Sequence, residues 1–156
     1  MDHKGFLQQV VELSWEKWKA YEGGPFAALV VKDGVVVGRG WNRVTGTNDP
    51  TAHAEMVAIR DACRAIGSFS LEGAVIYSSS EPCPMCLAAI YWARLERVYH
   101  ANTAAEAAAV GFDDAFLYQQ FALPATERSL PVERVFVEGA LDVLAGWAAD
   151  PLTVPY

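Results

Sequence analysis

The 156-residue chain has few cysteines, few cations and no long apolar run, and each shortage excludes a class of protein. Its three cysteines, two of them in one Cys-x-x-Cys pair, are too few for a disulfide-stapled secreted scaffold. No apolar stretch approaches the roughly 20 residues that a membrane-spanning helix needs. The N-terminus also lacks the pattern of a signal peptide. We therefore expect a single soluble domain over residues 1–156, located in the cytoplasm, with no membrane partner.

Cations are scarce as well. The 12 lysines and arginines face 19 acidic residues, which gives a formal net charge of −7. Residues 101–156 hold eight acidic residues and two basic ones, Arg128 and Arg134, so this third of the chain carries −6. Binding to nucleic acid depends largely on lysine and arginine neutralising phosphates. The composition therefore predicts no nucleic-acid partner.

Apolar periodicity and turn residues predict alternating helices and strands. The Asp33-Gly34 pair between two valine-rich runs predicts a β-hairpin. Thr51 is the expected N-cap of the helix that runs to residue 66. We expect strands at residues 26–31, 35–41, 74–78, 97–101 and 132–138, and helices at 6–21, 51–66, 82–93, 104–110, 114–120 and 140–149. A hairpin followed by β-α-β crossovers predicts an α/β fold of three layers, α/β/α, around a mixed five-stranded sheet.

Two short segments combine the residue types of a metal centre. They read Thr51-Ala52-His53-Ala54-Glu55 and Glu81-Pro82-Cys83-Pro84-Met85-Cys86. Zinc favours nitrogen and sulfur ligands, and a catalytic zinc keeps one of its four positions open for water. We therefore expect His53, Cys83 and Cys86 to bind Zn²⁺. The cysteines open a predicted helix, whose positive end favours the thiolate form that zinc requires.

Glu55 is predicted to act beside the metal without binding it, because residues two apart do not share a helix face. Zinc lowers the pKa of a bound water to ~7. A neighbouring carboxylate can take a proton from that water and deliver it to a ring nitrogen or to a departing amine. The expected reaction is hydrolytic loss of ammonia from an amino-substituted heterocycle.

The same residue types also occur in other kinds of site. A Cys-x-x-Cys pair alone also occurs in redox proteins and structural zinc sites. A structural site needs four protein ligands, and the spare thiol, Cys63, falls on the apolar side of its helix, where a core position is expected. A redox pair would not need His53 and Glu55. A catalytically silent zinc fold that serves as a binding module would have no use for the Glu55 carboxylate.

Several segments resemble a known family. The segment 48–55 and the cysteine motif at 81–86 resemble the cytidine-deaminase-like superfamily, in which bacterial guanine deaminases and tRNA adenosine deaminases share this core. The segment Gly111-Phe112-Asp113-Asp114-Ala115-Phe116-Leu117-Tyr118 is similar to the guanine deaminases. So are Gly24-Pro25-Phe26, residues 89–94 and the chain's end at Tyr156. The resemblance covers nearly the whole length.

The resemblance implies a zinc-dependent homodimer that converts free guanine and water to xanthine and ammonia in purine catabolism or salvage. It implies Glu55 as the proton shuttle and Asp114 as a second catalytic carboxylate. The residues that it implies as substrate contacts are Phe26, Asn42, Ala54, Trp92, Phe112, Asp114 and Tyr156. Without it, Phe26 and Trp92 would be assigned to core packing, Asn42 to a loop amide and Asp114 to a cap.

Two rival substrates share this chemistry. A tRNA adenosine deaminase should carry a basic C-terminal helix, whereas residues 140–149 contain Asp142 and no lysine or arginine. The sequence does not distinguish guanine deamination from deamination of another small ring, such as cytosine or an aminotriazine.

The tail, residues 150–156, holds two prolines and ends in Tyr156. We expect it to stay extended and to cover the active site of its own subunit or of a partner.

Overall fold

The computed structural model describes residues 2–156 and contains two compact units, one that ends at Phe116 and one that comprises Leu117–Tyr156. The first unit opens with α1 (His3–Lys19), which begins about one turn earlier than the apolar pattern predicts. The Asp2 side chain explains the early start, since it accepts a hydrogen bond from the Gly5 amide at 2.9 Å and so caps the helix.

The predicted hairpin is present. Strands β1 (Ala27–Lys32) and β2 (Val35–Trp41) pair antiparallel, with Ala27 opposite Trp41. Both turn residues adopt the left-handed conformation, with φ of 50° at Asp33 and 78° at Gly34. An Asp-Gly pair tolerates this geometry, and the resulting turn matches the twist of the flanking strands.

The sheet is mixed and has four strands in the order β2-β1-β3-β4. Strand β3 (Ala74–Ser80) pairs antiparallel with β1, and β4 (Arg97–Asn102) pairs parallel with β3. Helix α3 (Ala54–Ile66) lies between β2 and β3 in the chain, and α4 (Pro84–Trp92) makes the crossover from β3 to β4. A short helix, α2 (Val44–Thr47), interrupts the loop between β2 and α3.

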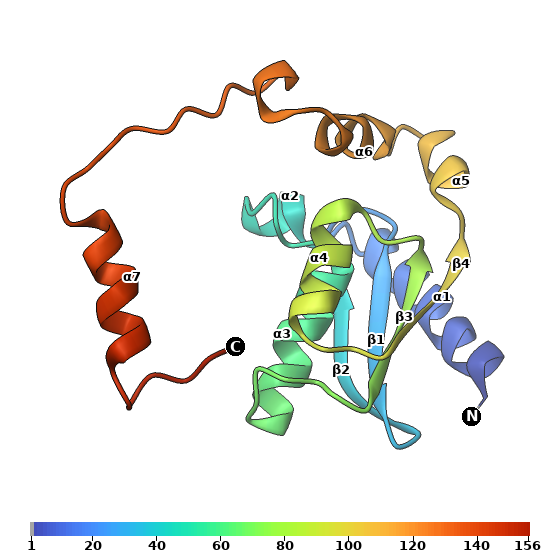
Figure 1. Ribbon diagram of the computed structural model, residues 1–156. Helices are drawn as coiled ribbons and strands as arrows, with labels where there is room; N and C mark the ends of the chain where they lie inside the picture. The colour runs from blue at the N-terminus through green and yellow to red at the C-terminus, as the bar shows by residue number, and fades with distance from the viewer. Residues whose placement is uncertain (1) are drawn as a thin grey trace. The chain divides into compact units, whose positions relative to one another are not determined.

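Helices α3 and α4 cover one face of the sheet and α1 covers the other (Figure 1). Alternating side chains of the central strands pack against these two layers. Ala28, Val30 and Ile76 pack in one core against α3 and α4, whereas Leu29 and Tyr77 pack in a second core against α1. The α/β/α layering expected from the sequence is thus confirmed for the first unit.

Two glycines of β2 let α3 approach the sheet closely. A Cβ atom at Gly40 would lie 2.1 Å from the main-chain oxygen of Ala54, and one at Gly38 would lie 2.5 Å from that of Ala58. Neither position has room for a side chain, because the obstacle is helix backbone. This contact fixes the first turn of α3, which carries Glu55, against the sheet.

The expected fifth strand is absent. Residues 132–138 form no ladder with any other segment of residues 2–156. Val132, Val135 and Phe136 are all exposed. These residue types favour strands, but a strand forms only where a neighbour takes up its backbone hydrogen bonds. The sheet therefore has four strands instead of five.

The remaining elements are short. Helix α5 (Ala104–Ala108) follows β4 and begins with a capping box in which Thr103 and Glu106 bond each other's main chain. Helix α6 (Ala115–Ala122) crosses the boundary between the units, and the second unit continues with η1 (Ala125–Glu127) and α7 (Ala140–Ala149). No helix within residues 2–156 combines the length and apolar character that crossing a bilayer requires.

Candidate metal centre and active site

The two sequence motifs meet at the N-termini of α3 and α4. His53 and Cys83 are the residues immediately before these helices, and both have extended backbones. Neither side chain caps its own helix, so both remain available for another partner. Thr51 was expected to cap α3, but its hydroxyl donates instead to Asp49 Oδ1 at 2.7 Å. The helix consequently begins at Ala54.

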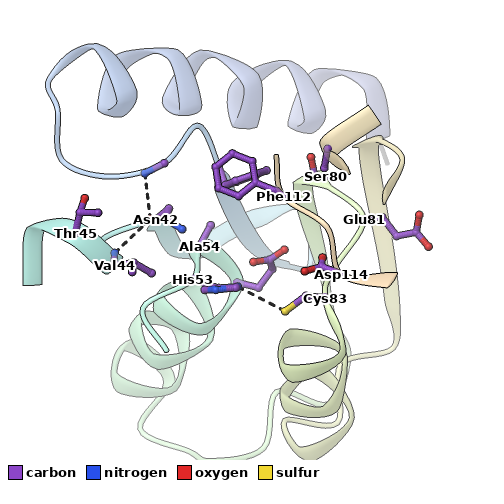
Figure 2. Close-up of a pocket in the computed structure, with 14 residues that line it drawn as sticks. Asn42, Val44, Thr45, His53, Ala54, Ser80, Glu81, Cys83, Phe112 and Asp114 are labelled. Carbon is purple, nitrogen blue, oxygen red and sulfur yellow. Dashed lines mark hydrogen bonds between the residues drawn. The ribbon is translucent and has the colours of Figure 1, made fainter. Parts of the chain in front are cut away.

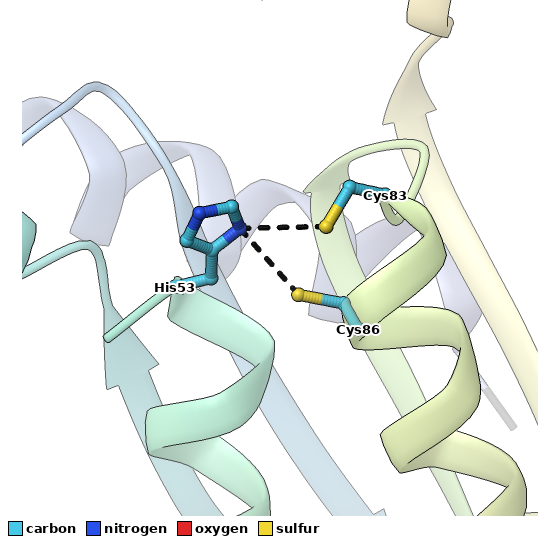
Figure 3. Close-up of side chains that lie close together, drawn as sticks. All are labelled: His53, Cys83 and Cys86. Atoms are coloured by element: carbon cyan, nitrogen blue, oxygen red, sulfur yellow. Dashed lines mark hydrogen bonds between the residues drawn. The ribbon is translucent and has the colours of Figure 1, made fainter. Parts of the chain in front are cut away.

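The donor atoms of His53, Cys83 and Cys86 converge. The Nδ1 atom of His53 lies 3.5 Å from Cys83 Sγ and 3.6 Å from Cys86 Sγ (Figure 3). All three donor atoms lie within 4.8 Å of one another, and both cysteines are buried. Cys83 and Cys86 point the same way because they are three residues apart across the first turn of α4.

The shifted pKa values of His53, Cys83 and Cys86 show that the three groups share protons that a metal cation could replace. A hydrogen bond from Cys86 lowers the pKa of Cys83 and so favours its thiolate form. The same hydrogen bond, together with burial, raises the pKa of Cys86. The hydrogen bond between His53 and Cys83 raises the pKa of the imidazole. A metal ion would take the place of the protons that these three groups share.

The donor set fits zinc of the catalytic type. One imidazole and two thiols are the soft ligands that zinc prefers, and three protein ligands leave a coordination position open. No fourth histidine, cysteine or carboxylate belongs to this cluster within residues 2–156. Cys63 is partly buried elsewhere, next to the core between the sheet and α3.

Glu55 lies in the first turn of α3 and is 7% exposed. Burial raises the pKa of its carboxyl group, and a hydrogen bond from Ser78 works in the opposite direction. That bond joins Ser78 Oγ to Glu55 Oε1 at 2.8 Å. A desolvated carboxylate whose pKa is shifted upward is suited to accept and return protons near neutral pH.

A cavity of about 290 Å³ opens above these groups. Its volume suits a small ligand. Asn42 and Thr45 lie on one side of it, and Ser80 and Glu81 on the other (Figure 2). The residues that line it are Gly24, Phe26, Asn42, Val44, Thr45, His53, Ala54, Glu55, Ser80, Glu81, Cys83, Ala107, Phe112 and Asp114.

Asn42 both ties two loops together and faces the cavity. Its Oδ1 atom accepts hydrogen bonds from the Gly24 amide at 3.1 Å and the Val44 amide at 3.2 Å (Figure 2). These bonds occupy the carbonyl end of the side chain. The amide nitrogen is therefore the end available to a ligand, and it can only donate.

Two aromatic rings and a second carboxylate complete the lining. Phe26 and Phe112 meet edge to face, with centroids 4.7 Å apart and planes at 88°. Such rings offer apolar contact to a planar heterocycle. Asp114 is partly buried, and burial followed by the charge of Cys83 raises the pKa of its carboxyl group.

The structure brings most of the expected site residues together. Eight residues expected from the sequence line the cavity, namely Phe26, Asn42, His53, Ala54, Glu55, Cys83, Phe112 and Asp114. Cys86 completes the donor cluster beneath. Trp92 does not belong to the lining; it lies at the end of α4 with 62% of its surface exposed. Tyr156 lies in the second unit, and its role stays a prediction.

Sequence reasoning missed several residues. Ser78 gave no motif signal, because a serine inside an apolar strand does not reveal its partner. Thr45 of α2, Ser80 at the end of β3 and Glu81 in the following loop also line the cavity. For Glu81 and Ser80, nearness to Cys83 in the sequence was the available signal.

Comparison with known proteins identifies the family to which this chain belongs. The family model described as the zinc-binding region of cytidine and deoxycytidylate deaminases matches residues 1–102. Guanine deaminase from Bacillus subtilis is 47% identical over 147 residues, which cover 94% of each chain. The X-ray structure of guanine deaminase from Bacillus subtilis matches with a TM-score of 0.96 and 45% identity, covering 100% of this chain and 99% of that one.

A tRNA-specific adenosine deaminase from Agrobacterium fabrum is 50% identical, but over 76 residues only, which is 49% of this chain and 50% of that one. The site geometry and these matches define the class: the chain belongs to the cytidine and deoxycytidylate deaminase zinc-binding family, in the group that contains the Bacillus subtilis guanine deaminase. The similarity to guanine deaminase continues through nearly the whole chain, past the end of the family model at residue 102.

Proposed function

We propose that this protein is a zinc-dependent guanine deaminase, which converts guanine and water to xanthine and ammonia. The observation that carries the proposal is one small cavity lined by His53, Cys83 and the buried Glu55, with Cys86 completing the cluster of donor atoms. Similarity to a guanine deaminase over 94% of the chain supports guanine as the base.

His53, Cys83 and Cys86 would hold the zinc ion, and zinc would supply Lewis-acid activation of water at neutral pH. The chain's own contribution is proton transfer. Glu55 accepts one proton of the attacking water at its carboxylate and gives it to a ring nitrogen of the base. It then takes the second proton of that water and gives it to the amino group, which leaves as ammonia. The buried position of Glu55 keeps bulk water away from these transfers.

Binding and orientation of the base would come from the cavity walls. Phe26 and Phe112 contact the ring, and the Asn42 amide donates to an acceptor on its edge. Asp114 accepts from the N–H and amino groups that guanine presents, and xanthine alters that edge. This assignment explains how one cavity binds the substrate and releases the product.

The tail and the subunit arrangement belong to the proposal as well. Residues 150–156 contain two prolines and three apolar anchors, Leu152, Val154 and Tyr156. We propose that this tail covers an active site, of its own subunit or of the partner in a homodimer. We also propose a cytoplasmic location and no nucleic-acid partner, because the net charge of −7 opposes binding to phosphate backbones.

A substrate panel tests the proposal. Ammonia release is measured from guanine, adenine, cytosine, an aminotriazine, the corresponding nucleosides and tRNA, with zinc-loaded wild-type protein and with Glu55→Gln as the background. We expect turnover of free guanine well above that of every other compound. A preference for tRNA with tight, salt-sensitive binding would instead establish the rival activity, and no ammonia from any base would refute deamination.

A further inference from the structure

Ser78 is a polar residue on an otherwise apolar face of the central sheet. It lies in β3 between Ala28 of β1 and His100 of β4, and it is 1% exposed. Strand alternation puts its side chain on the same face as Ile76, which packs with α3 and α4. A hydroxyl in such a place needs a partner, because an unpaired buried polar group is costly.

The partner is the carboxylate of Glu55. Ser78 Oγ donates to Glu55 Oε1 at 2.8 Å, and both side chains are buried. The two adjacent serines make other contacts. The hydroxyl of Ser79 accepts from the Ala27 amide at 3.1 Å, and Ser80 lines the cavity. Of the three serines, only Ser78 is hydrogen-bonded to the proton-transferring group.

A neutral donor suits this task. A lysine or arginine at position 78 would pair with Glu55 and hold it ionised, whereas a hydroxyl fixes its direction without fixing its charge. The bond is made to Oε1, one of the two carboxylate oxygens. The carboxylate of Glu55 sits at the end of a flexible side chain. Catalytic groups must be held close to their productive geometry, so this carboxylate needs a fixed partner.

We propose that Ser78 is the positioning residue for Glu55: its hydroxyl anchors one carboxylate oxygen so that the other faces the reacting groups. The inference rests on the proposed proton transfer by Glu55 and not on the identity of the base. It therefore holds for any aminated ring that the enzyme deaminates.

The decisive experiment compares Ser78→Thr with Ser78→Val. Threonine and valine have nearly the same shape, so any packing cost is shared, and the pair differs by the hydroxyl alone. We expect Ser78→Thr to keep most of kcat and Ser78→Val to lose roughly 10- to 100-fold, the range for a lost hydrogen bond to a charged group. KM and zinc content should match between the two variants.

A matched control lies one residue further along β3. Ser79→Ala also removes a buried hydroxyl, and that hydroxyl bonds main chain instead of Glu55. We expect a lower Tm with unchanged kcat. If Ser79→Ala reduces kcat as strongly as Ser78→Val, the Ser78 effect is a general packing defect and the inference is wrong.

A second readout does not depend on activity. In zinc-loaded protein with ¹³C-labelled glutamate side chains, the Glu55 carboxyl resonance is assigned by its disappearance in Glu55→Gln. It should stay in place in Ser78→Thr and move in Ser78→Val. An unmoved resonance in Ser78→Val, or equal kcat for both variants on an active enzyme, overturns the proposal. If the wild type deaminates no base, the proposed function fails while the resonance still decides the role of Ser78.

Discussion

Replacing Asn42 by aspartate separates two tasks that this side chain performs. The Asn42 carbonyl oxygen bridges the Gly24 and Val44 amides, and its NH₂ group is left to face the cavity. Asn42→Asp has the same shape and keeps an oxygen for the bridge. The NH₂ donor becomes an oxygen that can only accept when ionised. The loops should therefore hold while recognition of the base fails.

The expected loss follows from the unpaired acceptor on the base. Leaving a buried acceptor without its donor costs about 1–3 kcal/mol, and about 1.4 kcal/mol corresponds to a factor of ten. We therefore expect kcat/KM for guanine to fall roughly 5- to 150-fold. The position is 8% exposed, so water has little access to compensate.

The assay combines steady-state ammonia release, thermal unfolding and zinc content for three proteins: wild type, Asn42→Asp and Asn42→Ala. Asn42→Ala removes the bridge as well as the donor, so it should lose both Tm and activity, whereas Asn42→Asp should lose activity with a Tm near that of the wild type. Wild-type kcat/KM in Asn42→Asp would refute the base contact. A Tm as low as that of Asn42→Ala would show that the amide serves the loops alone.

Removing one ligand, Cys86→Ala, should reduce bound zinc from one ion per chain to a small fraction in metal analysis; full zinc content would mean that the cluster is not the metal site. Glu55→Gln should keep zinc and Tm but lose kcat by roughly 10²–10⁴-fold, because an amide cannot shuttle protons; near-normal turnover would assign this task to another group. Asp114→Ala should lower kcat/KM for guanine roughly tenfold with zinc retained, because one polar contact to the base is lost. Deletion of residues 152–156 should have an effect of similar size, because the proposed cover of the active site is lost. A truncated enzyme with full activity would show that the tail does not cover the site.

Features set by a few consecutive residues were predictable. The Asp33-Gly34 turn forms because both residues tolerate positive φ, whatever the rest of the chain does. Cys83 and Cys86 share a side because their spacing and the helix start at Pro84 are local properties. Thr51 shows the limit of such arguments. Its hydroxyl bonds the nearby Asp49 side chain instead of capping the helix, and the helix begins at Ala54.

The fifth strand was predicted from residue types that favour strands, but residues 132–138 lack the neighbouring strand that such an element needs. Trp92 was expected in the cavity wall and lies exposed at the end of α4, because the fold decides which side of a helix end faces a cavity. In both cases the sequence specified a tendency, and long-range contacts decided the outcome.

By itself, the sequence determined which chemistry this protein supports, because imidazole, thiols and carboxylate are properties of residue types at short spacings. Only the tertiary structure decided how that chemistry is held in place. The bond from Ser78 to Glu55 spans 23 positions, and the bond from Gly24 to Asn42 spans 18. Glu55 reaches Ser78 from the first turn of α3, which packs closely over Gly40 of β2. Such contacts form only when distant segments pack together, so no local pattern in the sequence encodes them.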